Sequence, residues 1–510
     1  MFPASNVIFS ASPRGAGALQ SDTKFFIEAA AAVFLFYYSY LMWFAPGLLL
    51  DPDTLWHIVT GQWILDHRQF PTVDFYSYTA TGKPWISTEW LAETFYATAY
   101  KLAGWRGVTI LASASCSAII AIVCFYLLRQ LRFSVAIGLT ALTEAAVSSH
   151  FIARPHIYSY ILLAIWTISL LDAYDDEKFD LPSPFFLSPL MILWANLHGS
   201  FTFGLLLLYV FTGFCLYHAF IKHDYAKFRW LVIAVFVVSA SAMLTPYGIE
   251  PAFMTTKLMG MKSLHNIMEW GPPDFQKRPL LLAFLIAILL AMAGLGIRFR
   301  GPRLVVFALI AFVGLRYIRA LHMFFLLMPI IIARPAAERL RFIAPQLSAT
   351  QKLEEDKAAD PVLDLLQRRS TPILAGFLAL AMLSTASAWW REDIVPPKQN
   401  MPEAAIDFVK RENISGNVFN SYQFGGYLIF SGIPTFIDGR AELFGDTLLQ
   451  KYKDAVELRD IRGAFETLDE YKVNWIIMAP KEPLAIALAQ RADWNQVFAD
   501  EYSVVFVRHH

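Results

Sequence analysis

Charged residues are scarce in this chain of 510 residues. Asp, Glu, Lys and Arg make up 16% of the sequence, whereas 56% of the residues are hydrophobic, and soluble globular domains usually carry about 25% charged residues. This deficit indicates a protein that folds in a non-aqueous solvent. The formal net charge is zero, so the composition gives no reason to expect a nucleic-acid partner.

Cysteines are few, and nucleotide-binding motifs are missing. Cys116, Cys124 and Cys215 all lie inside apolar runs, where we expect them to act as small hydrophobic packing residues rather than as metal ligands or disulfide partners. The sequence has no Walker-type, dinucleotide-binding or nucleophile-elbow motif. Without a phosphate-binding loop for ATP, an energised pump is not expected. A donor molecule that arrives through the membrane is the natural alternative.

Long apolar runs are abundant. A hydrocarbon core about 30 Å thick requires about 20 apolar residues per helical span, and the hydropathy pattern predicts about eleven transmembrane helices. The pattern therefore predicts a polytopic α-helical membrane domain over residues 1–390. Its predicted spans are 25–49, 107–128, 134–151, 156–173, 184–197, 201–221, 230–246, 279–297, 304–319, 321–334 and 372–390.

Lysine and arginine collect in alternate connections between these spans. Because such residues mark cytoplasmic loops, the predicted topology has the N-terminus inside and the C-terminal region outside. The basic positions on the predicted inner side are Arg14, Lys24, Arg129, Arg132, Lys222, Lys227, Arg229, Arg298, Arg300, Arg303 and a cluster from Arg334 to Arg369.

Three polar stretches exceed simple turns. Residues 51–106 are predicted to form a long outer loop whose aromatic density suits interfacial helices or a bound sugar, whose apolar ring face can stack on an indole. Residues 335–371 are predicted to be a cytoplasmic linker. Residues 391–510 alternate predicted strands (417–420, 434–437, 473–478 and 503–508) with predicted helices (402–412, 445–457, 461–471 and 481–491), which is typical of a small α/β domain outside the cytoplasm.

The first outer loop opens with two carboxylates and a histidine. Asp53 and His57 are four residues apart, so a helix that begins near Pro52 would place both on one face. Asp53 could simply cap that helix, but a cap needs one carboxylate, and Asp51 is a second. Glu89 and Glu93 share the same spacing, and they either line one helix face or are solvated charges.

Further ionisable residues are predicted on the same outer side, where each is a functional hypothesis because charge at membrane depth is costly. Arg316 and Arg319 are three residues apart and either clamp a phosphate or extend to lipid headgroups. The Asp438-Gly-Arg440-Ala-Glu442 turn either binds an acceptor or forms an internal salt bridge. The remaining outer residues of interest are Asp74, Trp90, Arg154, His198, Glu269 and Trp270.

Together these motifs resemble the GT-C class of integral-membrane glycosyltransferases, particularly the bacterial protein mannosyltransferase and aminoarabinose transferase group. The stretches that carry the resemblance are Asp51-Pro-Asp53, Asp74-Phe-Tyr-Ser-Tyr-Thr79, Trp85, Glu89-Trp-Leu-Ala-Glu93, Trp194-Ala-Asn-Leu-His198-Gly, Pro246-Tyr-Gly and Phe436-Ile-Asp-Gly-Arg-Ala-Glu442.

The resemblance implies an enzyme of the bacterial cytoplasmic (inner) membrane that uses a polyprenyl-phosphate-linked sugar on the outer, periplasmic face. It implies inversion at the anomeric carbon, with Asp53 or Asp51 as general base and Asp53 favoured. The sugar acceptor would be a lipid, a glycan or a protein. The implied donor-phosphate ligands are Arg316, Arg319, His198 and Arg154, and the implied sugar or acceptor ligands are His57, Asp74, Glu89, Trp90, Glu93, Glu269 and Trp270.

A divalent metal, Mg²⁺ or Mn²⁺, is left open, with Asp51, Asp53 and His57 as its candidate ligands. Two rival functions also stay open. One is a transporter or flippase of a lipid-linked glycan, although the chain shows no duplicated halves of the kind common in transporters. The other is an inactive scaffold of envelope assembly with the same fold.

Overall fold

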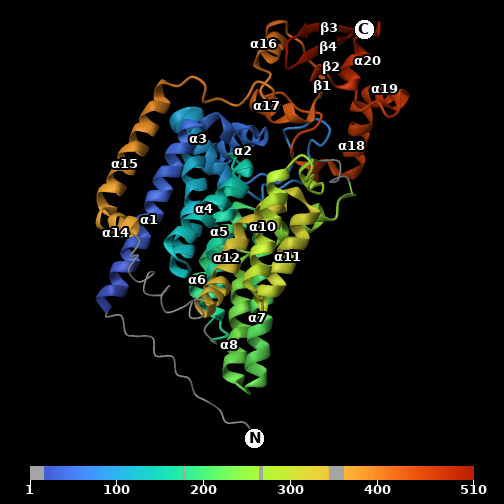
Figure 1. Cartoon of the computed structure of the whole chain (residues 1–510). Helices are drawn as coiled ribbons and strands as arrows, with labels where there is room; N and C mark the ends of the chain where they lie inside the picture. Colours follow the sequence, from blue (N-terminus) through green and yellow to red (C-terminus); the bar gives the residue numbers. More distant parts are fainter. Residues whose placement is uncertain (1–15, 176–177, 263–267, 344–360, 510) are drawn as a thin grey trace.

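Helices dominate the computed structural model, which describes residues 16–175, 178–262, 268–343 and 361–509 (Figure 1). Within these residues, six helices are long and apolar enough to cross a membrane, so the chain is a multi-pass membrane protein. They are α1 (Ala16–Trp43), α3 (Trp90–Gln130), α5 (His156–Tyr174), α7 (Phe201–Ile221), α12 (Ile318–Ile343) and α15 (Ser370–Ser387).

Every predicted span coincides with helical structure, but five of these helices are shorter. Because these five are below the length of a full span, the number of eleven crossings stays a prediction. They are α4 (Phe133–Val147), α6 (Pro184–Leu197), α8 (Tyr225–Ser241), α10 (Pro279–Leu295) and α11 (Pro302–Arg316).

Two boundaries differ from the prediction. Helix α3 begins at Trp90, inside the predicted loop 51–106, and a break at Ala103–Gly104 separates this first part from the apolar span. Helix α12 continues through Pro335 to Ile343, so the predicted linker starts later than residue 335. The linker also contains α14 (Pro361–Arg368), while its charged run 351–357 lies outside the described residues.

The bundle core is built around α3, which packs against α1, α4, α5 and α12. Small buried side chains such as Ala112, Cys116 and Cys124 let these helices approach closely. All three cysteines are buried and free of disulfides, which confirms their predicted role as packing residues.

The C-terminal region combines a four-stranded sheet with short helices at one end of the bundle (Figure 1). The sheet order is β1-β2-β4-β3, with β1 and β2 parallel and the other pairs antiparallel. The strands are β1 (Asn417–Asn420), β2 (Val473–Met478), β3 (Trp494–Ala499) and β4 (Val504–Arg508). The helices are α16 (Glu403–Arg411), α17 (Gly425–Phe430), α18 (Ala441–Val456), α19 (Ile461–Glu470) and α20 (Pro483–Leu488).

The predicted strand at 434–437 is wrong, and β3 was not predicted. Thr435 makes one isolated bridge, to Ser77 of the first loop. This segment pairs with the first loop instead of the sheet. Strand β3 alternates poorly between buried and exposed residues, because it lies at the edge of the sheet.

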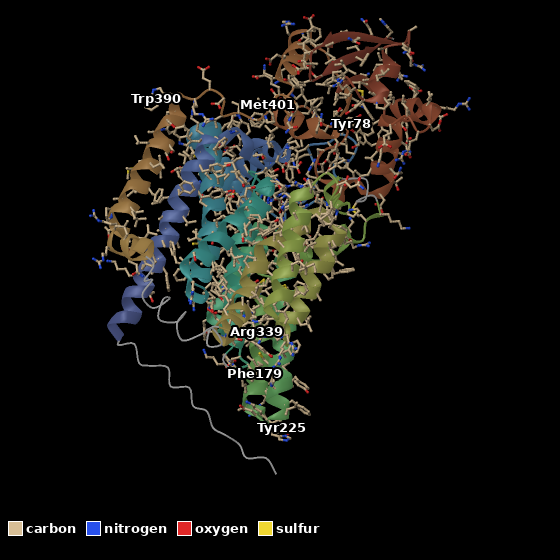
Figure 2. All side chains as sticks on the ribbon, viewed as in Figure 1. Tyr78, Phe179, Tyr225, Arg339, Trp390 and Met401 are labelled. Atoms are coloured by element: carbon tan, nitrogen blue, oxygen red, sulfur yellow. The ribbon has the colours of Figure 1, made fainter. Side chains whose placement is uncertain are left out.

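The first loop and the C-terminal region are joined by hydrogen bonds. Tyr78, labelled in Figure 2 among the C-terminal ribbons, donates its hydroxyl to the Val418 carbonyl at 2.9 Å. Thr79 donates to the Phe436 carbonyl at 2.7 Å. Helix α2 (Asp53–His67), which follows the first turn of the loop, packs against both α3 and α17. The loop is therefore held between the bundle and the C-terminal region.

A buried ion network completes this junction. The Arg440 guanidinium donates to Asp74 at 2.6 Å and to Asp438 at 2.8 and 2.7 Å, and the Arg440 and Asp74 side chains are fully buried. The guanidinium also lies over the rings of Tyr76 and Trp85. The turn from Asp438 to Glu442 therefore contains an internal salt bridge, between Asp438 and Arg440. Asp74 of the first loop is the second partner of Arg440.

We expect Arg440→Gln to lower the thermal unfolding temperature of the detergent-purified protein strongly. Removing one partner of a buried pair leaves uncompensated charge and costs about 3–5 kcal/mol. The matched control is Arg459→Gln, because Arg459 is half-exposed in its pair with Glu457 and such pairs contribute about 0–1 kcal/mol. Equal unfolding temperatures for the two variants would contradict this role of Arg440.

Candidate functional site

A cavity of about 900 Å³ lies where the helical bundle, the first loop and the C-terminal region meet. Its polar part is lined by the start of α2, the Trp85–Glu89 segment and the turn that precedes α18. Its other part extends between membrane helices, where its wall is apolar. The apolar wall includes Leu163, Leu206, Met254, Leu309, Val313 and Met323.

Arg154 is the centre of charge in the polar part. Its guanidinium contacts Asp53 at 2.8 Å, Asp51 at 3.2 Å and Glu269 at 3.2 Å. The turn that carries it is fixed because Ala153 donates its N–H to Leu48 and accepts the Thr54 hydroxyl. Arg154 lowers the pKa of Glu269 from its usual value. One cation therefore holds three carboxylates from two segments of the chain.

The two aspartates play different parts. One Asp51 oxygen accepts the Asp53 backbone N–H at 2.7 Å, and its other oxygen binds Arg154, so Asp51 caps the start of α2 and Asp53 does not. Asp53 binds Arg154 through Oδ2 at 2.8 Å. Burial raises the pKa of Asp53 to about 7, although Arg154 partly opposes that shift.

Gly439 lies directly against Asp53. A Cβ atom at this position would come within 1.9 Å of Asp53 Oδ1, so only glycine lets the turn approach so closely. The next residue, Arg440, is anchored by its ion pairs with Asp74 and Asp438. The turn is therefore held against one side of the Asp53 carboxylate.

Asp53 and His57 do share one face of α2, and both line the cavity. His57 Nδ1 is 3.1 Å from Glu93 Oε1, and His57 Nε2 is 3.6 Å from Glu89. Glu89 also contacts His198 Nε2 at 3.2 Å. Gly61 of α2 lets this helix approach α3 closely enough for these contacts, because a Cβ at position 61 would lie 2.0 Å from the Glu93 carbonyl oxygen. Burial raises the pKa of Glu89 to about 7 and lowers the pKa of His57 and of His198.

Arg316 and Arg319 do not form the predicted clamp. Helix α11 ends at Arg316, Tyr317 is extended, and α12 begins at Ile318, so the two side chains do not share a helical face. Arg316 is exposed and donates to the Tyr317 hydroxyl at 3.0 Å. Arg319 lines the cavity, 5.4 Å above the Trp270 ring and 4.0 Å from Glu269.

Two further predicted ligands lie outside the cavity lining. Asp74 is fully buried beneath Arg440. Trp90 donates its indole N–H to Asn196 at 2.7 Å and packs against Phe70. Both residues therefore stabilise the loop. Glu93, Glu269 and Trp270 do line the cavity.

Sequence reasoning missed residues that the C-terminal region and α5 bring to the cavity. They have no spacing signal, because sequence-distant segments supply them. Glu442 could have been found, since it belongs to the turn already singled out, and burial raises its pKa. The missed polar lining residues include His150, Tyr160, Tyr422 and Tyr452.

The residues proposed for a metal do not form a metal-binding group. Asp51 and Asp53 both bind Arg154, and His57 binds glutamates. Among the described residues, no set of three or more His, Cys, Asp or Glu side chains is placed to hold a metal ion.

Comparisons with known proteins bear on the fold alone. No family model and no curated protein matches the sequence. The apo oligosaccharyltransferase of Archaeoglobus fulgidus superposes with a TM-score of 0.52 at 12% identity, over 89% of this chain and 69% of that one. ArnT from Cupriavidus metallidurans gives 0.48 at 15% identity in the apo state and 0.47 at 14% identity when bound to undecaprenyl phosphate, over 96% of this chain and 98% of that one in both cases.

The chain shares its fold with the Archaeoglobus fulgidus oligosaccharyltransferase. The resemblance expected from the short motifs is confirmed at that level, and the mostly helical architecture agrees with it. The fold supports many sites, so the activity has to be argued from the cavity.

We expect Gly439→Ala to displace the turn from Asp53 and to lower the thermal unfolding temperature, because the added Cβ would overlap the Asp53 carboxylate. The control is Gly432→Ala, because Gly432 lies in the same region with nothing near its Cβ position. Gly432 has a φ of +77°, so this control carries backbone strain but no steric clash. The measurement is the unfolding temperature of the detergent-purified protein, and equal values for the two variants would contradict the close approach.

Proposed function

We propose that the protein is a membrane glycosyltransferase that moves a sugar from a polyprenyl-phosphate donor to an acceptor hydroxyl at the outer face of the membrane. The observation that carries the proposal is the position of Asp53. This carboxylate lies in a cavity that joins a polar chamber to an apolar wall between membrane helices. Such a cavity suits a donor that has a charged, sugar-bearing head on a lipid chain.

Asp53 is the proposed general base. The acceptor hydroxyl gives its proton to Asp53 while its oxygen attacks the anomeric carbon. The bond from that carbon to the phosphate oxygen breaks, and its electron pair leaves with the lipid phosphate, so the anomeric centre inverts. Asp51 is less suited to this role because both of its oxygens are already engaged.

Arg319 is the proposed ligand of the donor phosphate. Its ion pair with Glu269 is long at 4.0 Å, whereas Arg154 is held by three carboxylates. A fixed guanidinium offsets the charge that develops on the leaving phosphate. The proposed role of Arg154 is to orient Asp53, and Arg316 has no proposed role in the site.

Glu89 and Trp270 are proposed sugar contacts, since carboxylates accept hydrogen bonds from hydroxyl groups and indoles stack on sugar rings. His57 and His198 contact Glu89, and Glu93 orients His57. No step of this mechanism passes through a metal, because the described cavity residues are not arranged to bind one.

The proposed placement is a bacterial inner membrane crossed about eleven times. In it, residues 391–510 form a small α/β domain on the periplasmic side. Support comes from the distribution of basic residues and from the sheet at the cavity end of the bundle.

Asp53→Asn should reduce transfer by about 10²- to 10⁴-fold, the usual contribution of a general base. The assay incubates membranes that contain the full chain with radiolabelled polyprenyl-phosphate sugars and separates the products. Asp51→Asn is the matched variant. Its amide oxygen can still accept the Asp53 backbone N–H and so keeps the helix cap, and transfer should therefore fall much less than in Asp53→Asn. Full activity of the Asp53→Asn protein would overturn the mechanism. Movement of the lipid-linked sugar between leaflets without a new glycosidic bond would favour a transporter.

Transfer should also depend on pH near neutrality. Burial raises the pKa of Asp53 to about 7, so the base is protonated and inactive below that pH and ionised above it. We therefore expect kcat to rise through pH 6–8 and then level off. Burial also raises the pKa of Glu89 to about 7, so the profile should be repeated with Glu89→Gln. A rate that is already constant above pH 5 would contradict a buried base.

A further inference from the structure

An apolar groove of about 580 Å³ lies at the end of the bundle opposite the C-terminal sheet, between α1, α3 and α5. Its floor is built from small residues, Ala30 and Ala31 of α1 and Ala118 and Ala121 of α3. Larger side chains, including Phe34, Ile122 and Ile168, form its sides. Because the small residues recess the surface of helices that cross the membrane, the groove is open to lipid chains.

A separate polar pocket of about 340 Å³ adjoins the groove at the ends of α3, α5 and α12. Arg129 lines both cavities, so the apolar groove leads to a polar end. Figure 2 labels Phe179 and Arg339 at this end of the bundle. The polar pocket is lined by Arg129, Gln130, Asp172, Lys178, Arg334, Ala337 and Glu338.

The pocket presents charges of both signs. Arg129 contacts Asp172 at 3.1 Å, with 42% and 36% of the two side chains exposed. Arg334 contacts Glu338 at 3.0 Å and Asp175 at 3.1 Å, and Glu338 is 63% exposed. Partly exposed ion pairs of this kind are weak. A ligand that carries both an anion and a cation can therefore replace or extend them.

We propose that the groove and the pocket form one binding site for a zwitterionic phospholipid with a primary ammonium headgroup, the chemistry of phosphatidylethanolamine. One acyl chain fills the groove. The phosphate faces Arg129 and Arg334, and the ammonium faces Asp172 and Glu338.

The headgroup choice follows from the two carboxylates. A lipid with a glycerol headgroup would place its phosphate against the two arginines, but it would bring no cation to Asp172 and Glu338. A choline headgroup carries the positive charge but has no N–H to donate to them. A primary ammonium supplies three donors and a compact charge. The site lies at the opposite end of the bundle from Asp53, so it does not depend on the proposed transfer reaction.

The test is native mass spectrometry of the full chain in detergent with an equimolar mixture of phosphatidylethanolamine, phosphatidylglycerol and phosphatidylcholine that share the same acyl chains. We expect phosphatidylethanolamine to be retained at least fivefold more than either competitor. Equal retention would reduce the site to general lipid contact and overturn the proposal. A preference for phosphatidylglycerol, or displacement of all three lipids by undecaprenyl phosphate, would overturn it as well.

Two variants separate the groove from the pocket. Ala121→Phe fills the groove without changing any charge, and it should reduce retention of phosphatidylethanolamine at least fivefold. Asp172→Asn should instead remove the preference over phosphatidylcholine while leaving total lipid retention in place. The control is Leu383→Phe on α15, a residue that is 67% exposed and outside both cavities. Unchanged selectivity in Asp172→Asn would contradict the assigned ammonium contact, and the wild-type competition remains decisive if a variant fails to fold.

Discussion

The geometry of the cavity depends on the buried guanidinium of Arg440. It binds Asp74 of the first loop and Asp438 of the C-terminal region in a place where water cannot reach either carboxylate. Burying three charges is costly unless each is paired and hydrogen-bonded, so the two segments are stable only when they meet. Their meeting sets Gly439 against Asp53 and brings Glu442 and Tyr422 to the cavity.

A second buried arginine gives the neighbouring aspartates their different surroundings. Arg154 binds both, but Asp51 also accepts the first backbone N–H of α2. Asp51 is therefore engaged in capping the helix, whereas Asp53 remains available for the proposed reaction. The same burial that raises the pKa of Asp53 makes it a stronger base once it is ionised. This is a reason, based on environment and not on residue type, for favouring Asp53 in the proposed reaction.

The sequence predicted what depends on local periodicity. Apolar runs located the membrane helices, and the four-residue spacing placed Asp53 and His57 on one face of α2. It failed where an outcome depends on distant segments or on a local break. Arg316 and Arg319 have helical spacing, but the extended Tyr317 separates their helices. Asp74 was predicted to bind the sugar or the acceptor, but it forms a buried ion pair with Arg440, which lies 366 positions later in the chain.

The cavity also explains why the first loop and the C-terminal region have to close over the bundle. A polyprenyl-phosphate donor needs apolar contact for its chain and charged contact for its head, and only the membrane edge offers both. Water at that edge would screen the arginines and compete with the acceptor hydroxyl. The covering turn at Gly439 and the buried wall at Trp85 limit that access. In the proposed enzyme, the junction that stabilises the fold is therefore the same structure that keeps the reacting groups from bulk solvent.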